Sequence, residues 1–600
     1  MSNAQLETCN LQRHLDCMDK EKVASVLTEI GVLLELKGEN PFKTRAYVNA
    51  ARILENLGEP LERLVSEKRL GEIKGIGEAL EKKITELVET GKLVYYEELK
   101  AATPPGFFEM LELSGVGPKK IRALHDKLGI ETIEQLESAC KSGKVAGLDG
   151  FGEKTAANIC EAIQLRRTYA SKHLLSDALR AAEPVLENLR AHADVIRCSS
   201  AGSLRRFKEI IGDIDLLASS KQPAEVIEFF VSQPGIVKVL AKGETKASVI
   251  LDGGIQSDLR VVSDAEFPFA LAYFTGSKEH NIVMRQRAIA RGLRLNEYGL
   301  FKSKEETRDP KLLLPCKTEE EIFAKLDLPF VEPELREDLG EFTAAEKNEL
   351  PELIEWSDLK GSLHNHSNWS DGKGSLEEIA TFMDGLGLGY WAITDHSKSS
   401  VQANGLDAKR LREQILAIKK INERFAKHGS EFRLLAGSEV DILKNGLDFD
   451  DELLAELDVV VASLHLPSGD EKENTKRLIH AAENKYVHVI AHMTGRLLLE
   501  REPYPVNIHE VIDACAATGT WIELNCNPHR FDLDWRHWSY AKSKGVKCVI
   551  NSDAHRNEHA GFLRLGAGIG RKGWLEQVDV FNTLKLGLLS KELKRKRVKT

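Results

Sequence analysis

The stretch GSLRRFKEIIGDIDLL at residues 202–217 decides how the middle of the chain folds. Its second half is an apolar run in which Asp213 and Asp215 stand two residues apart, so both point to one side of a predicted strand. A third carboxylate, Asp258, lies in another alternating run at residues 255–262. Three carboxylates at one point repel each other strongly unless cations neutralise them. The pattern therefore predicts two Mg²⁺ or Mn²⁺ ions, bridged by Asp213 and Asp215, with Asp258 on the ion that activates an attacking hydroxyl.

The residues before this run supply groups for a triphosphate. Gly202 and Ser203 would present a backbone N–H and a hydroxyl, and Arg206 would pair with the negative charge. A lone Asp-x-Asp pair is common on surface strands. The preceding glycine-serine turn and the third aspartate favour nucleotidyl transfer over that interpretation.

This segment resembles the nucleotidyltransferase palm of family X DNA polymerases, the family of polymerase beta, and the resemblance continues to residue 298. It implies that DNA and deoxynucleoside triphosphates are the substrates. Phe207 departs from the pattern, because a small residue is usual there, and Ile211 replaces a serine on the phosphate side. Neither change removes a metal ligand. The resemblance further implies nucleotide contacts at Gly212, Tyr273, Phe274, Gly276 and Asn281, and DNA contacts at Lys246, Arg260 and Arg285.

Residues 20–170 have Leu, Ile and Val at helical spacing and contain three copies of one short motif. A Gly-apolar-Gly turn recurs at residues 75–77, 115–117 and 150–152, each between two predicted helices. Such a turn exposes backbone N–H groups at the start of the second helix, where a phosphate can bind. The repeat resembles helix-hairpin-helix motifs and favours sequence-independent DNA binding over a purely structural repeat. The expected contacts are Gly75, Gly77, Gly115, Gly117, Lys119, Lys120, Gly150, Gly152 and Lys154.

The first copy, with residues 41–51 before it, resembles the small N-terminal domain of family X polymerases. In lyase-active members a lysine forms a Schiff base with an abasic sugar, and the matching position here is Lys83, with Lys43 and Tyr47 as neighbours. Schiff-base chemistry requires an unprotonated amine. The alternative is that Lys83 is an ordinary solvated helix lysine, as the adjacent Lys82 suggests.

Residues 361–600 hold 13 of the 18 histidines and contain apolar runs that end in metal-binding side chains. The runs are 362–366, 390–396, 434–439, 459–465, 487–492, 521–525 and 549–555. Helical patterns separate them, which predicts a distorted (β/α)₇ barrel with ligands at the carboxyl ends of parallel strands. Imidazole and carboxylate ligands without thiolate suit two or three Zn²⁺, Mn²⁺ or Fe²⁺ ions. The ligand set is His364, His366, Asp371, His396, Glu439, His465, His492, Asp553 and His555.

This pattern resembles the polymerase and histidinol phosphatase (PHP) domain, and every metal-ligand position of that family is filled. Such a site activates water for phosphoester hydrolysis. By the resemblance, members fused to a family X polymerase are 3′-5′ exonucleases, some with 3′-phosphodiesterase or abasic endonuclease activity. Met493 replaces a usual proline, and substrate phosphates are expected at Gly495, Arg496 and residues 527–530.

Composition limits the classes of protein. Hydrophobic residues make up 42% and charged residues 29% of the 600, which is typical of a globular chain. The net charge of −10 excludes a uniformly basic nucleic-acid coat. No apolar run approaches the roughly 20 residues that span a bilayer, and residues 1–10 lack a signal-peptide core. Nine scattered cysteines without a Cys-x-x-Cys pair fit a reducing cytoplasm, where we expect the protein to act.

The composition also divides the chain. Residues 331–360 carry ten acidic against three basic residues and read as a linker. The predicted fold is multidomain, with an all-α helix-hairpin-helix region, an α+β palm with a thumb, and a (β/α)₇ PHP barrel. The expected domains are an N-terminal helical lyase-like domain at 1–100, fingers at 101–170, a palm at 171–265, a thumb at 266–330, the linker, and the PHP domain at 361–600.

Together these features predict a DNA-directed DNA polymerase that fills short gaps in base excision repair, with a PHP site that trims mismatched or blocked 3′ ends. The expected partners are gapped or primed DNA and deoxynucleoside triphosphates, without a membrane. We expect a monomer, because one chain can bind a gap unaided. Two alternatives remain: a PHP phosphatase that acts on a small metabolite and has an inert front half, and a non-enzymatic scaffold that binds DNA ends.

Overall fold

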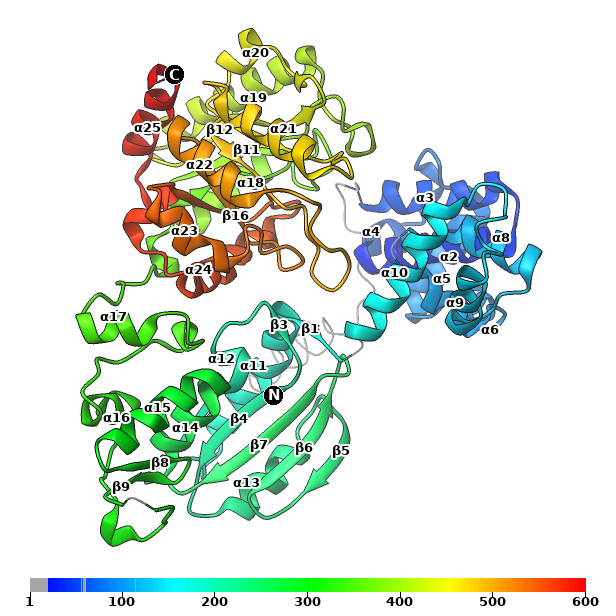
Figure 1. Ribbon diagram of the computed structural model, residues 1–600. Coiled ribbons are helices and arrows are strands. Elements are labelled where there is room, and N and C mark those ends of the chain that lie inside the picture. The colour runs from blue at the N-terminus through cyan, green and yellow to red at the C-terminus, as the bar shows by residue number, and fades with distance from the viewer. Residues whose placement is uncertain are drawn as a thin grey trace. The chain divides into compact units, whose positions relative to one another are not determined.

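The computed structural model describes residues 20–599, apart from residues 56, 58–60, 114, 170 and 304. The first 19 residues of the expected N-terminal domain lie outside this part. Two compact units divide between Ala170 and Ser171. No helix of the described part is both long and apolar enough to cross a bilayer. The first unit is helical (Figure 1) and contains α2 (Lys20–Lys37), α3 (Pro41–Glu55), α4 (Leu61–Ser66), η1 (Leu70–Glu72), α5 (Glu78–Thr90), α6 (Val94–Ala101), α7 (Pro105–Leu111), α8 (Pro118–Leu128), α9 (Ile133–Lys141) and α10 (Glu153–Tyr169).

Each Gly-apolar-Gly segment forms a turn before a helix. Gly77 and Gly117 are the N-caps of α5 and α8, and α10 begins directly after Gly152. The first glycine of each turn has a φ between 77° and 104°, a conformation that favours glycine. The apolar residue between the glycines is at most 5% exposed, so it anchors the turn to the helical core. The predicted helix-hairpin-helix fold of this region is confirmed.

The second unit begins with the palm, a mixed sheet with the strand order β2-β4-β7-β6-β5. Strands β4 and β7 run parallel with Asp215 paired to Asp258, and the other pairs are antiparallel. Asp213 lies one residue before β4, because a turn divides the predicted strand and its first part, β3, pairs with β1 instead. The elements are β1 (His173–Leu174), α11 (Leu175–Ala191), β2 (Arg197–Ser200), α12 (Gly202–Arg205), β3 (Ile210–Ile211), β4 (Ile214–Ser219), α13 (Pro223–Val231), β5 (Ile236–Lys242), β6 (Lys246–Leu251) and β7 (Gln256–Val262).

The thumb follows the palm, and the predicted linker packs against it. Leu335 and Phe342 from the linker are buried in the thumb core beside Phe323. Within residues 331–360 the chain forms short helices. The elements are α14 (Phe267–Thr275), α15 (Lys278–Ala290), β8 (Arg294–Asn296), β9 (Gly299–Phe301), η2 (Pro310–Leu312), α16 (Glu319–Lys325), η3 (Pro333–Leu335), α17 (Glu341–Lys347) and η4 (Trp356–Asp358).

The C-terminal part is a parallel barrel with the strand order β10-β11-β12-β14-β15-β16-β17, flanked by helices (Figure 1). Each predicted apolar run overlaps one of these strands. The ends of the sheet close, because the Asp553 N–H donates to the His364 carbonyl at 3.0 Å. The elements are β10 (Gly361–Ser362), α18 (Leu376–Gly385), β11 (Tyr390–Ile393), η5 (Val401–Ala403), α19 (Ala408–Lys427), β12 (Arg433–Leu443), β13 (Gly446–Leu447), α20 (Asp451–Ala455), β14 (Val459–Ser463), α21 (Glu471–Glu483), β15 (Val489–Ile490), α22 (Ile508–Thr518), β16 (Trp521–Asn525), η6 (Trp535–His537), α23 (Trp538–Ser543), β17 (Cys548–Asn551), η7 (Asn557–Gly561), α24 (Phe562–Lys572), η8 (Gln577–Asp579), η9 (Phe581–Thr583) and α25 (Leu586–Lys599).

A continuous cluster of buried apolar side chains runs from the palm into the barrel. It includes Leu216 and Leu259 of the palm sheet together with Ile522 and Ile550 of the barrel strands. The palm and the barrel therefore share packing within the second unit, and residues of one domain can shape the site of the other.

Candidate functional site

The nine ligands predicted for the barrel meet at the carboxyl ends of its strands. Within the described residues, groups of His, Asp and Glu whose ligand atoms lie within 4.8 Å of one another include all nine. The groups are His366, Asp371, His396 and His555; His364, His492 and Asp553; His364, His366 and Glu439; and His396, Glu439 and His465.

Glu439 stands at the centre of this cluster, with 1% of its surface exposed. Its Oε1 lies 3.0 Å from His492 Nε2 and 3.1 Å from His465 Nε2. Its Oε2 lies 2.8 Å from His396 Nδ1 and 3.5 Å from His364 Nε2. The two oxygens of one carboxylate therefore face different imidazoles, which is the arrangement that lets a carboxylate bridge two ions.

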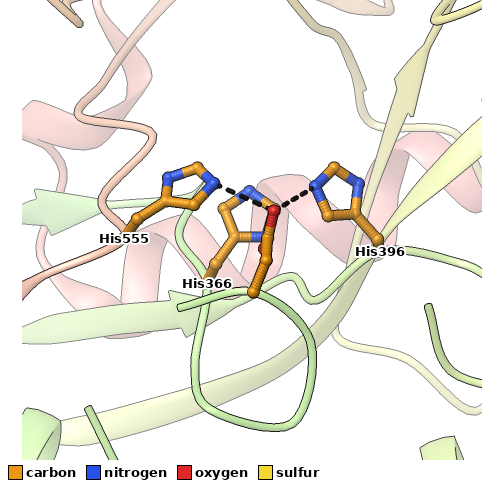
Figure 2. A group of neighbouring side chains, drawn as sticks. His366, His396 and His555 are labelled. Atoms are coloured by element: carbon orange, nitrogen blue, oxygen red, sulfur yellow. Dashed lines mark ion pairs between the residues drawn. The ribbon is translucent and has the colours of Figure 1, made fainter. Parts of the chain in front are cut away.

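Asp371 and Asp553 contribute the other carboxylates of the cluster. Figure 2 shows His396 and His555 on either side of His366, and the Nε2 atoms of the two flanking rings each lie 3.5 Å from Asp371 Oδ2. Asp553 Oδ1 lies 3.2 Å from His366 Nε2. The imidazoles thus converge from the segments that follow β10, β11 and β17 onto shared carboxylates.

This donor set fits divalent cations. The buried Nε2 atoms of His364 and His366 lie near carboxylates but make no hydrogen bond among the described residues. Burial would lower the pKa of His396, but Glu439 and Asp371 raise it to about 11. The carboxylates thus retain a proton on His396 at the point where a cation would bind, whereas burial and the neighbouring His396 and His555 lower the pKa of His366. Binding of a metal ion would displace the His396 proton.

Two buried carboxylates that sequence reasoning missed support the ligands from behind. Glu523 in β16 is 0% exposed, and its Oε1 lies 2.7 Å from His364 Nδ1. Asp441 in β12 bonds His465 Nδ1. Such partners fix which ring nitrogen faces the metal. The spacing carried a signal for one of them, because Asp441 follows Glu439 by two residues on the same strand.

The two arginines expected at the substrate phosphate have different surroundings. Arg496 is buried, pairs with Asp534, and donates to the Arg530 carbonyl at 2.8 Å, so its guanidinium shapes the loop. Arg530 Nε lies 3.8 Å from Asp553 Oδ2, beside the ligand cluster. Arg530 is therefore the better placed of the two to meet a phosphate.

The palm aspartates are less tightly grouped than the barrel ligands. Among the described residues, no choice of one carboxylate oxygen each from Asp213, Asp215 and Asp258 puts the three atoms within 4.8 Å of one another. Lys246 Nζ lies 2.7 Å from Asp258 Oδ2 instead. Burial, and then the charges of Asp213 and Asp258, raise the pKa of Asp215 to about 6. A bound cation would relieve the repulsion among these three carboxylates. The donor set therefore fits a divalent cation.

The turn expected to bind the triphosphate packs directly on the metal-site strand. Gly202 has a φ of 59°, and a Cβ there would lie 2.1 Å from Asp215 Oδ2, so glycine is required. Ser203 follows it in α12, and Gly212 lies in the turn between β3 and β4. Arg206 is already engaged, because its Nε lies 3.1 Å from a carboxylate oxygen of Glu337 and its Nη1 donates to the carbonyl of residue 275 at 2.7 Å.

The residues expected beside the sugar and base also come together. Asn281 Nδ2 donates to the Tyr273 carbonyl at 2.7 Å, and both residues line one pocket with Arg285. A Cβ at Gly276 would lie 2.7 Å from Asn281 Oδ1. In addition, the Tyr273 and Phe274 rings meet edge to face at 5.2 Å, and the Arg260 guanidinium lies 4.9 Å from the centre of the Phe274 ring.

The basic residues expected to contact DNA in the first unit lie at the hairpin turns. Lys119 and Lys154 are exposed. Lys120 Nζ donates to the Gly115 carbonyl at 2.8 Å, so this lysine also holds its own turn. Both side chains reach solvent at two different turns, and Lys119 Nζ lies 3.8 Å from Glu35 Oε1, an ion pair that it would exchange for a phosphate.

The lysine expected to form a Schiff base lies among aromatic rings. Lys83 Nζ is 4.8 Å from the centre of the Tyr95 ring, which stacks on Tyr47 at 6.3 Å. Lys43 Nζ is 5.9 Å from the same Tyr95 ring. The structure thus brings together the three residues that the resemblance implied.

Comparisons with known proteins extend these observations. Family models match as a DNA polymerase beta thumb at residues 270–337, a helix-hairpin-helix domain at 18–93 and a SAM-like helix-hairpin-helix tandem at 107–165. The chain is 40% identical over 583 residues to the DNA polymerase/3′-5′ exonuclease PolX of Bacillus subtilis (strain 168), which covers 96% of this chain and 100% of that protein. A probable phosphatase of Thermoanaerobacter sp. (strain X514) is 31% identical over 178 residues, 28% of this chain and 70% of that protein. A probable phosphatase of Caldanaerobacter subterraneus is 34% identical over 137 residues, 20% of this chain and 50% of that protein.

Proposed function

The chain belongs to the PolX family of DNA polymerase/3′-5′ exonucleases, and on that premise we propose that it fills short gaps during base excision repair and trims 3′ ends in its barrel domain. The helix-hairpin-helix and thumb matches support binding of gapped or primed DNA. Similarity to the PolX relative over 96% of this chain favours this function over a small-metabolite phosphatase with an inert front half. The same similarity speaks against a non-enzymatic scaffold.

In the polymerase site, Asp213, Asp215 and Asp258 would hold Mg²⁺ or Mn²⁺, which lowers the pKa of the primer 3′-hydroxyl and stabilises the leaving pyrophosphate. Asp258 would then exchange its ion pair with Lys246 for the cation. The released ammonium of Lys246 becomes available to a DNA phosphate. Arg206, at the edge of the same site, would pair with the triphosphate.

In the nuclease site, the nine barrel ligands would hold two or three Zn²⁺, Mn²⁺ or Fe²⁺ ions, which activate water and stabilise charge on the phosphoryl group. Glu439 belongs to two of the ligand groups and so sets the distance between them. Glu523 and Asp441 keep the Nε2 atoms of their histidines turned inward. Arg530 lies where it can pair with the phosphate that is being cut.

The observation that carries this proposal is that one chain holds two separate carboxylate-rich sites, one of which gathers nine metal-type ligands. A gapped primer that ends in a 3′-phosphate tests it, because a polymerase needs a free 3′-hydroxyl. We expect the full chain with Mn²⁺ to remove the blocked end and then add nucleotides, and a chelator to stop both steps. Lack of incorporation on an unblocked gapped primer would overturn the polymerase assignment.

We also propose that Lys83 is a Schiff-base lysine for abasic 5′ ends, supported by its position over Tyr95. Borohydride should trap a covalent adduct between the protein and an incised abasic site. Lys83→Ala should lose the adduct. Lys82→Ala is the matched control, because Lys82 is exposed and pairs with Glu78 at 2.8 Å, and it should keep the adduct. An undiminished adduct with Lys83→Ala would contradict the proposal.

We further propose that the protein acts as a cytoplasmic monomer. The seven cysteines in the described residues are free, which supports a reducing compartment. Light scattering should give a single species near 66.9 kDa, and a mass of twice that value would contradict the monomer.

A further inference from the structure

Helix α24 of the barrel packs against the palm turn that carries the expected triphosphate residues. Phe207, directly after Arg206, has a φ of 56°, and its ring lies on Gly568 of α24. A Cβ at Gly568 would stand 2.1 Å from Phe207 Cε1, and one at Gly566 would stand 2.5 Å from Ile550 Cγ2 of β17. Glycine is costly in a helix interior. These glycines therefore let α24 fit closely between the barrel sheet and the palm.

The last residue of α24 reaches the same turn through its charge. Lys572 is 0% exposed, and its Nζ lies 3.0 Å from the Arg206 carbonyl oxygen and 2.6 Å from Glu337 Oε1. Arg206 Nε lies 3.1 Å from that same oxygen of Glu337. One carboxylate oxygen is therefore shared between a lysine of the nuclease domain and the arginine expected to bind the triphosphate.

A second buried contact fixes the far end of the turn. Glu209 is 5% exposed, and its two oxygens accept from Trp535 Nε1 at 2.9 Å and from Arg536 Nη1 at 3.0 Å. Lys572 Nζ also lies 4.6 Å from the centre of the Trp535 ring. Barrel side chains thus hold the palm segment on both sides of Phe207.

We propose that α24 of the nuclease domain supports nucleotide binding at the polymerase site. Lys572 at the end of α24 is a positioning residue for Arg206. Lys572 takes up part of the Glu337 charge, so that Arg206 can turn from Glu337 to the triphosphate. It also fixes the Arg206 backbone. This inference rests on the proposed polymerase function. The inference also explains why Phe207 stands where the resemblance predicts a small residue. The Phe207 ring is the surface on which Gly568 of α24 packs.

Steady-state gap filling by the full chain tests the inference through Lys572→Met. We expect the KM for the deoxynucleoside triphosphate to rise about ten-fold with kcat within about two-fold. Glu337 Oε1, no longer shared with Lys572, would hold Arg206 more tightly, while Lys208 Nζ stays 4.0 Å from Oε2 in both proteins. Trimming of 3′ ends should not change, which also shows that the barrel is folded. Arg571→Met is the matched control. Arg571 pairs with Glu334 at 2.7 Å across the same boundary without contacting Arg206, so its KM should stay within about two-fold.

Two further variants separate positioning from general support. In Lys572→Met combined with Glu337→Gln, loss of the carboxylate releases Arg206, and we expect the KM to return to within about three-fold of the parent. A purely structural role for Lys572 gives no such recovery. Gly568→Ala displaces the Phe207 ring without changing any charge, and it should raise the KM as well.

The outcomes distinguish this inference from the function on which it rests. A parent chain that fills gaps, together with a Lys572→Met variant of unchanged KM, would overturn the role of Lys572. An equal rise in KM for Arg571→Met would overturn it too, because the effect would then belong to the interface as a whole. A parent chain that incorporates no nucleotide would overturn the proposed function and this inference with it.

Discussion

Replacement of Asp215 by asparagine should stabilise the metal-free protein at neutral pH while it removes polymerase activity. Burial, together with Asp213 and Asp258, raises the pKa of Asp215 from 3.8 to about 6. The folded state therefore binds this proton more tightly than the unfolded state does. Its contribution to the free energy of unfolding falls as the pH rises from about 4 to about 6. Above that range the ionised carboxylate destabilises the fold.

The size of the effect follows from the two pKa values. At about 1.4 kcal/mol for each pKa unit, the difference between 3.8 and about 6 corresponds to about 3 kcal/mol. Asp215 keeps some contact with solvent, which reduces the gain expected for Asp215→Asn to about 1–2 kcal/mol. The second unit spans residues 171–600, so its unfolding entropy is large and such a gain raises Tm by roughly 1–2 °C.

Calorimetry with a chelator at about pH 7.5 and about pH 4.5 measures this gain. We expect a higher Tm for Asp215→Asn at the upper pH and about a third of that gain at the lower pH, where the carboxyl is largely protonated in the folded state but still largely ionised in the unfolded state. Asp252→Asn is the matched control, since Asp252 is an exposed carboxylate just after β6, and its Tm should shift by less than about 0.5 °C. An unchanged or lower Tm for Asp215→Asn at about pH 7.5, or an equal gain at about pH 4.5, would refute the reasoning.

Three further predictions concern the nuclease ligands and the DNA contacts. Glu523→Gln should lower 3′ trimming about 10–100-fold and leave gap filling unchanged in paired assays, because Glu523 fixes the orientation of the His364 ring. Unchanged trimming would contradict this role. Lys154→Ala should reduce the slope of log binding constant against log salt by about one in anisotropy titrations with gapped DNA, whereas an unchanged slope would remove Lys154 from the interface. Dialysis against a chelator should lower the unfolding temperature of the barrel, and added Zn²⁺ or Mn²⁺ should restore it; a temperature that does not respond to metal would show that the ligands hold none.

The barrel site could be predicted from the sequence because its ligands follow apolar runs directly. Parallel strands place such residues at one edge, so position along the chain translates into position in space. Glu523 and Asp441 could not be recognised in the same way. Each reads as an ordinary polar residue in a strand, and its role depends on a histidine 159 or 24 residues away in sequence.

The palm and the linker show where local patterns are insufficient. Alternation predicted Asp213 inside a strand, but β4 begins at Ile214, because pairing with the distant β1 draws the preceding residues away. The acidic composition of residues 331–360 predicted a linker, yet Glu334 and Glu337 pair with Arg571 and Lys572, more than 230 residues further along the chain. Partners at that separation leave no trace in local composition.

The most direct measurement compares Asp258→Ala and His465→Ala on one gapped primer with a mismatched 3′ end. With both variants in the same buffer and metals, Asp258→Ala should trim the end without extending it. His465→Ala should extend a matched primer but fail to trim the mismatch. If the chain has two independent metal sites, each variant must lose one activity and keep the other. Variants that both keep both activities, or a single variant that loses both while it remains folded, would contradict it.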